Sequence, residues 1–151
     1  MSLSKREQII QNVIESLETV SGIKKPVQRV LPAFQDMANF ASTQFPLCAV
    51  VGGLPRPLKP LELTGLTHQE AGIVSTLTVG VYVYFTITPT VHTQLDEVSQ
   101  AVWEALGTEP RRGGLARSSR IECNPEISQV LPYIAFNMKC HVNYTHTTLT
   151  L

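Results

Sequence analysis

One long alternation constrains the fold of this 151-residue chain more than any other feature. Between residues 72 and 89, apolar or small side chains occupy every second position, and threonine, glycine and tyrosine lie between them. The first set comprises Ser75, Leu77, Val79, Val81, Val83, Phe85 and Ile87. Because successive side chains of a strand point to opposite faces, the pattern predicts a long β-strand. One face would be dry, and the other would be polar and present Tyr82 and Tyr84.

A second alternation of similar length covers residues 133–145. Its apolar positions are Ile134, Phe136, Met138, Cys140, Val142 and Tyr144. Since a strand with one apolar face needs partners of matching length and pattern, we expect the two long segments to be neighbours in one sheet.

Two helices are predicted from apolar residues that recur at spacings of three and four. The first runs from residue 4 to about residue 21, with a capping-box pattern at Ser4 and Glu7 and with Gly22 in the place of a helix C-terminal glycine. The second covers residues 93–106. Its predicted buried face is formed by Leu95, Val98, Val102 and Leu106.

Shorter elements complete the predicted order. Strands are expected at residues 25–31, 46–52 and 121–123, and one or two helical turns at residues 33–42. This order favours an α+β fold. We expect a two-layer sandwich, in which a mostly antiparallel or mixed sheet of about four to five strands carries two helices on one face.

The chain has no internal repeat or dividing linker, so residues 1–151 are predicted to form one domain. Residues 53–70 contain three prolines, no convincing periodicity, and the cations Arg56 and Lys59. Loops of this length are usually functional or disordered, so we interpret this one as an excursion that meets something outside the domain. Residues 146–151 form a short threonine-rich tail.

Composition excludes several classes of protein. The twelve basic residues balance the twelve acidic ones, which gives no global electrostatic reason to expect a nucleic-acid or membrane partner. No stretch reaches the roughly 18 apolar residues of a membrane span. The cysteines are odd in number and lie in apolar runs, which favours buried, reduced thiols and a reducing compartment. They are Cys48, Cys123 and Cys140.

No pattern indicates an enzyme. The four histidines have no metal-binding spacing, and Cys140 and His141 must point to opposite faces of a strand. The best carboxylate pair, Asp96 and Glu97, diverges on a helix. We therefore predict no catalytic residue, no cofactor site and no metal site.

The most unusual local feature is a turn-rich arginine segment at residues 108–120, in which Glu109 is the one counter-charge. Its arginines are Arg111, Arg112, Arg117 and Arg120. Two interpretations stay open: a solvated turn, or a docking loop for acidic groups of another subunit or for phosphates. The tyrosines of the polar strand face are similarly open to two interpretations, solvent exposure or a subunit interface.

Four patterns together resemble the tail terminator, or tail completion, proteins of long-tailed bacteriophages. They are RxxIIxxVxxxLxxVxG in the first helix, which leads into KKPVQRVLP; TVGVYVYF in the long strand; TxLDEVSQAVWEAL in the second helix; and a final strand that ends in a short tail. The similarity covers most of the chain and rests on the order, length and pattern of the elements.

In that family an α+β domain forms a ring of six copies on the end of the tail tube, where it stops tube growth and offers a surface for head joining. The resemblance implies a structural virion protein at the head-proximal end of the tail, assembled in the host cytoplasm, without catalytic residues or cofactor. Its partners would be further copies of itself, the tail tube protein and a head or neck connector protein. It implies no membrane and no specific nucleic-acid recognition, with DNA free to pass through the ring.

By analogy, the contacts with neighbouring subunits or the tube fall on the long loop and on the arginine segment, with the two tyrosines as a further candidate. The candidate residues are Arg56, Lys59, Tyr82, Tyr84, Arg111, Arg112, Arg117 and Arg120. Two alternatives remain. One is a neck or head-completion protein, and the other is a small-ligand-binding or enzymatic α+β domain whose polar sheet face and long loop form a pocket.

Overall fold

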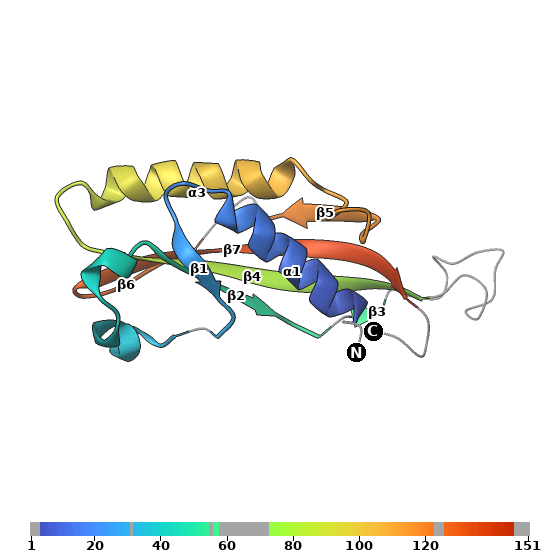
Figure 1. Ribbon diagram of the computed structural model, residues 1–151, viewed down its shortest axis with the longest axis horizontal. Coiled ribbons are helices and arrows are strands. Elements are labelled where there is room, and N and C mark those ends of the chain that lie inside the picture. Colours follow the sequence, from blue (N-terminus) through green and yellow to red (C-terminus); the bar gives the residue numbers. More distant parts are fainter. Residues whose placement is uncertain (1–3, 31, 55, 58–72, 123–125, 147–151) are drawn as a thin grey trace.

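The computed structural model describes residues 4–30, 32–54, 56–57, 73–122 and 126–146. Two helices, α1 (Lys5–Glu18) and α3 (Val91–Gly107), form one layer, and a mixed sheet forms the other (Figure 1). The predicted α+β class is confirmed. Of the expected long loop, Lys59 and most of its neighbours lie outside the described residues, as do residues 147–151 of the expected tail.

The centre of the sheet is the antiparallel pair of β4 (Ile73–Thr86) and β7 (Tyr133–His146). Both strands have 14 residues and pair along their whole length, from Ile73 opposite His146 to Thr86 opposite Tyr133. The prediction that the two long alternations are neighbours is therefore confirmed.

Shorter strands extend this pair on both sides. The main path runs β1 (Lys24–Gln28), β2 (Leu47–Gly52), β4, β7 and β5 (Ser118–Ile121), with β1 and β2 parallel. Two further strands, β3 (Arg56–Pro57) and β6 (Glu126–Val130), pair with β4 and β7 respectively. The described sheet has seven strands, more than the four to five expected, because these two short strands had no clear sequence signal.

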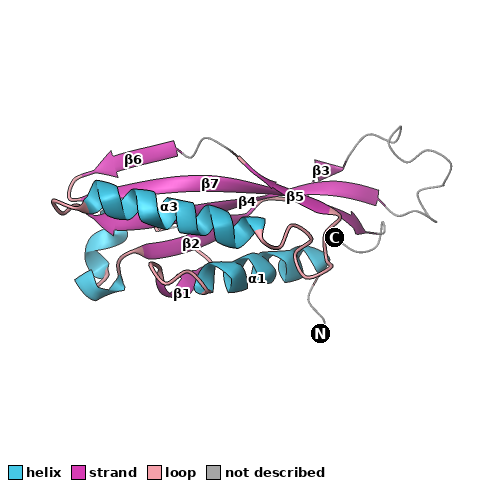
Figure 2. Cartoon of the chain, turned by 90° about the horizontal axis from the view of Figure 1, so that it is seen from above, coloured by secondary structure: helices cyan, strands magenta, loops and turns pink. Residues whose placement is uncertain are grey.

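Both helices pack on the same face of the sheet (Figures 1 and 2). The apolar face predicted for β4 is buried there, and so is that of β7. From α1 the core receives Ile9, Ile10, Val13, Ile14 and Leu17, and from α3 it receives Val91, Leu95, Val98, Val102 and Leu106. The face predicted for the second helix is thus its buried face.

The helix ends differ from the prediction in detail. Ser4 caps α1 as predicted, because its Oγ accepts a hydrogen bond from the backbone N of Glu7 at 3.1 Å. The helix ends at Glu18, earlier than expected, so Gly22 is not its C-terminal glycine. Gly22 instead passes close to α3, where an added Cβ would lie 2.9 Å from Cγ2 of Val98. Neither described helix is long and apolar enough to cross a bilayer.

A smaller core lies on the other face of the sheet, at one end. The 3-10 helices η1 (Phe34–Asn39) and η2 (Ser42–Gln44) follow β1 and lead into β2. The buried residues of this second core are Met37, Phe45, Leu47, Tyr84 and Ala135. One end of the predicted polar face is therefore covered, and no helix of the described residues packs on the remainder, which is called the open face below.

Tyr84 belongs to this second core and not to an open face. It is 4% exposed, and its hydroxyl donates a hydrogen bond to the carbonyl of Pro32 at 3.1 Å. The prediction of Tyr84 as an interface residue is wrong, because the segment between β1 and β2 folds over it. Tyr82, two positions earlier on the same face, is half-buried at the margin of this core.

Cys48 and Cys140 are buried free thiols in β2 and β7, which confirms their predicted role in core packing. Burial raises the pKa of Cys48 to about 12 and also raises that of Cys140. Cys123 lies outside the described residues.

Candidate interaction surfaces

The structure divides the arginine segment into exposed and buried members. Arg111, Arg117 and Arg120 are exposed, whereas Arg112 is fully buried. The prediction that Arg112 takes part in a docking loop is therefore wrong. Three of the four predicted arginines are available to a partner.

Arg112 joins the segment to both helices. Its φ of 48° is left-handed, and its guanidinium donates to the carbonyl of Leu106 and, at 3.3 Å, to Oγ of Ser16. Leu106 is at the C-terminal end of α3, where carbonyls lack helical partners and a cation is favoured by the helix dipole. Burial lowers the pKa of Arg112, while Cys140 and Glu109 oppose that shift. Arg112 is thus a structural cation.

Arg120 lies in a strand and not in a turn. The predicted strand at residues 121–123 begins earlier, so β5 contains Arg120 opposite His141 of β7. Directly opposed residues of antiparallel strands share a face, which places Arg120 on the sheet face that the helices leave uncovered. Arg117 precedes β5, and its backbone N donates to the carbonyl of Asn143 at 2.7 Å.

Arg56 falls in β3, where it pairs with Thr76 of β4. This strand adds a short edge beside β4. Lys59, the other cation expected in the long loop, lies outside the described residues.

A chain of polar side chains crosses the open face beside Arg120. Oγ1 of Thr78 lies 3.0 Å from Nδ1 of His141, and Nε2 of His141 lies 3.2 Å from Oε1 of Glu122. A hollow of about 400 Å³ adjoins them and is lined by Leu54, Thr76, Thr78 and His141. The hollow offers a hydroxyl and an imidazole to a polar ligand. Sequence reasoning missed this chain because Glu122 lies outside the alternating strands.

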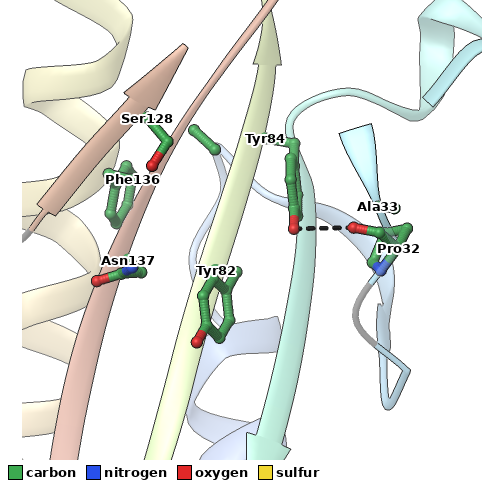
Figure 3. A pocket seen from close by; sticks show the side chains of 8 residues that line it. Pro32, Ala33, Tyr82, Tyr84, Ser128, Phe136 and Asn137 are labelled. Atoms are coloured by element: carbon green, nitrogen blue, oxygen red, sulfur yellow. Dashed lines mark hydrogen bonds between the residues drawn. The ribbon is translucent and has the colours of Figure 1, made fainter. Parts of the chain in front are cut away.

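A second hollow of about 360 Å³ lies where the open face meets the second core. It is lined by Pro32, Ala33, Tyr82, Tyr84, Ser128, Ala135, Phe136 and Asn137 (Figure 3). Tyr82 and Asn137 are opposite one another on β4 and β7. The ring of Tyr82 lies over Gly80, since an added Cβ there would lie 2.9 Å from Cε2 of the ring. Tyr82 lines this hollow and is half-buried, so it remains a candidate contact residue.

The edge strand β6 and the residue that follows it expose three large apolar side chains. All its residues are exposed, with Ile127 at 61% and Val130 at 51%, and Leu131 at the hairpin tip is 74% exposed. Within the described sheet, β6 pairs with β7 alone and lies at the edge away from β1 (Figure 2). It contains neither proline nor lysine, two residues that commonly protect an edge from pairing, and its one charged residue is Glu126 at its start. Sequence reasoning missed β6.

Among the described residues, no three His, Cys, Asp or Glu side chains gather closely enough to hold a metal ion. No protein-family model matches the chain, and a search of curated proteins finds no match either.

Proposed function

We propose that this chain is a structural phage protein, of which six copies form a ring on the head-proximal end of the tail tube. The ring ends tube polymerisation and provides the surface that the head joins. The protein works in the virion after assembly in the host cytoplasm, with the tube protein and a head or neck connector as its partners. The proposal starts from the resemblance of the element order to tail terminator proteins.

The observation that carries the proposal is the exposed apolar edge formed by β6 and Leu131. In an isolated molecule, an edge strand with exposed Ile127 and Val130 is a template for unwanted pairing. In a protein that works inside an assembly, the same edge is an interface. The one-sided helix layer adds a second broad surface, because no described helix covers most of the other face of the sheet.

Electron microscopy of particles assembled with and without the protein tests this role. We expect tails that grow well beyond their normal length when the protein is absent. Tails of normal length that fail to join heads would favour the alternative role in the neck. Normal particles without the protein would contradict both structural roles.

The β6 edge gives a test at the level of residues. Replacing Ile127 and Leu131 together by Glu should abolish attachment to tails, because two exposed apolar contacts become charged. The fold should persist, since both side chains are exposed. A variant with Thr19→Glu and Ser21→Glu, two exposed positions away from β6, is the control because it adds the same two charges. Attachment by the double variant at wild-type level would remove β6 from the interface.

A second candidate function, ligand binding, is favoured by the hollow beside Thr78 and His141. A ligand bound there would raise the melting temperature in a saturable way. A panel of small polar compounds can be screened by thermal shift, with His141→Ala as the variant that should lose the response. The absence of any saturable shift in the wild-type protein would count against this function.

A further inference from the structure

Two rows of hydrogen-bonded side chains cross the open face of the sheet, and each begins on β4 and continues on β7. In the first row, Oγ1 of Thr76 donates to Oδ1 of Asn143 at 2.7 Å, and Nδ2 of Asn143 donates to Oγ of Ser118 at 3.2 Å. A hydroxyl has one proton to donate, and that of Thr76 is used within this row. Thr76 lines the hollow of about 400 Å³, to which it can therefore offer only an acceptor.

The second row joins Thr78, His141 and Glu122, and its proton positions depend on the charge of His141. Nε2 of the ring lies 3.2 Å from Oε1 of Glu122, and an ionised carboxylate only accepts, so Nε2 carries a proton. In the neutral ring Nδ1 is then an acceptor, and it takes the hydroxyl proton of Thr78 at 3.0 Å. In the protonated ring Nδ1 donates to Oγ1 of Thr78 instead. The hydroxyl proton of Thr78 is then free to enter the hollow, which Thr78 and His141 also line.

The cations around His141 favour an anion in the hollow. Arg120 lies directly opposite His141 on β5, and Lys139 lies two positions before it on β7, so both share its face. Among the described residues, neither of these two cations forms an ion pair. Arg56 of β3 is paired with Thr76 of β4. The carboxylate of the second row attracts a positive charge on the ring, whereas Arg120 and Lys139 repel one, so a bound anion would favour the protonated ring.

We propose that the hollow binds a small oxyanion that carries a proton of its own, as hydrogen phosphate does, when His141 is protonated. An oxygen of the anion accepts from the hydroxyl of Thr78, and the P–OH group donates to Oγ1 of Thr76. Sulfate has no proton to donate at neutral pH, so Thr76 disfavours it. Binding takes up a proton at His141, which makes the affinity depend on pH. The inference rests on the second candidate function, ligand binding, for which it names the ligand class.

Titration calorimetry at about pH 6, with inorganic phosphate and with sulfate as the two probes, tests the pattern of donors and acceptors. Phosphate should bind about tenfold more tightly than sulfate, because sulfate leaves Oγ1 of Thr76 without a donor. Equal affinities would overturn the proposal, and so would the absence of phosphate binding.

Thr78→Val removes the hydroxyl and retains the shape of the side chain. It should weaken phosphate binding about tenfold or more, as expected for a lost hydrogen bond to a charged group. Thr86→Val is the matched control, because Thr86 lies on the same face of β4 opposite Tyr133 and does not line the hollow. Circular dichroism verifies that both variants are folded, and Thr78→Ser, which keeps the hydroxyl, should bind like the wild type. Unchanged binding by folded Thr78→Val would overturn the proposal.

His141→Asn tests the proton. The amide nitrogen of asparagine takes the place of Nδ1 and does not titrate, so it can donate to Thr78 at every pH. Between about pH 5 and 8, where histidine side chains change charge, the affinity of the wild type for phosphate should fall more steeply than that of the variant. The difference should reach up to about tenfold per pH unit. Phosphate itself titrates in the same way with both proteins, so parallel profiles would overturn the proposal.

Arg120→Gln tests the contribution of charge. It should weaken phosphate binding at every pH, and the effect should shrink as ionic strength rises from about 0.1 M to 1 M, because the screening length falls from about 10 Å to about 3 Å. Arg111→Gln, at an exposed position in the turn after α3, is the control for net charge. Equal weakening by the two variants would mean that net charge drives binding, which would overturn the site.

These measurements separate the inference from the function on which it rests. If phosphate does not bind but another polar compound raises the melting temperature through His141, ligand binding stands and the phosphate site is overturned. If no compound, phosphate included, gives a saturable response, both fail. Microscopy of tails tests the structural role independently of either result.

Discussion

Arg111 and Arg112 are neighbours in the sequence, but Arg111 is exposed and Arg112 is fully buried. Arg112→Ala should lower the free energy of unfolding by about 2–4 kcal/mol, because it removes the bonds to Leu106 and Ser16 and leaves a cavity between the helices. Arg111→Ala, at an exposed position, should change it by less than about 0.5 kcal/mol. Urea denaturation of the two variants measures the difference, and equal losses would contradict the structural role of Arg112.

The burial of Cys48 predicts a loss of stability at alkaline pH. Its pKa is about 12 in the folded protein, against an ordinary value of 9.0. Between these values the unfolded chain releases the proton while the folded protein retains it, so stability falls as pH rises and is unaffected below them. The loss is at most about 1.4 kcal/mol per pH unit from this group.

Burial and the neighbouring Tyr82 raise the pKa of Tyr84 to about 12 as well. Tyr84 therefore adds to the loss of stability above pH 10. Urea denaturation midpoints between pH 8 and 11 measure the effect. The loss of stability should begin near the ordinary pKa values, which are 9.0 for Cys48 and 10.0 for Tyr84. Cys48→Val, which retains an apolar side chain of similar size, should have a flatter profile than the wild type. Identical slopes would contradict the assignment to Cys48.

The burial of Arg112 and Tyr84 could not be predicted from local sequence. Each was placed correctly on its segment, but the groups that bury it come from distant parts of the chain. Ser16 of α1 contacts Arg112, and Pro32 accepts the bond from Tyr84. Exposure of a single side chain therefore depends on packing that local periodicity does not encode.

At the scale of elements, hydrophobic periodicity predicted the strands that bury one face over a long stretch. The strands β4 and β7 were predicted because each carries an apolar face over most of its length. The strand β6 was missed because its residues are all exposed, so burial imposed no alternation on them. Its position is set by pairing with β7.

The contact between α1 and β2 also makes a prediction. An added Cβ on Gly52 would overlap Cδ1 of Ile10, which is fully buried, so Gly52→Ala should destabilise the protein by about 1–3 kcal/mol. Gly107→Ala is the control, because nothing lies within 4 Å of its added Cβ and alanine favours a helix end. Thermal melting of the two variants should move in opposite directions. A melting temperature for Gly52→Ala at or above that of the wild type would contradict this packing.

At the scale of the whole molecule, the balanced composition conceals an uneven distribution of charge. Twelve basic and twelve acidic residues gave no reason to expect an electrostatic partner. Only the fold places the carboxylates of α3 and the cation Arg120 on opposite sides of the sheet. The sequence shows both the arginine segment and the carboxylates of α3, but it does not show on which side of the sheet each of them lies.

The full-length pairing of β4 with β7 also has a consequence for biosynthesis. The two partners are far apart in the chain, and β7 is the last strand in the described order. During translation, β4 and both helices leave the ribosome before the strand that completes the centre of the sheet. Such non-local pairing forms slowly and leaves apolar surface exposed meanwhile. The nascent chain is therefore most vulnerable to aggregation and proteolysis in the interval before β7 emerges, when chaperones would protect it most.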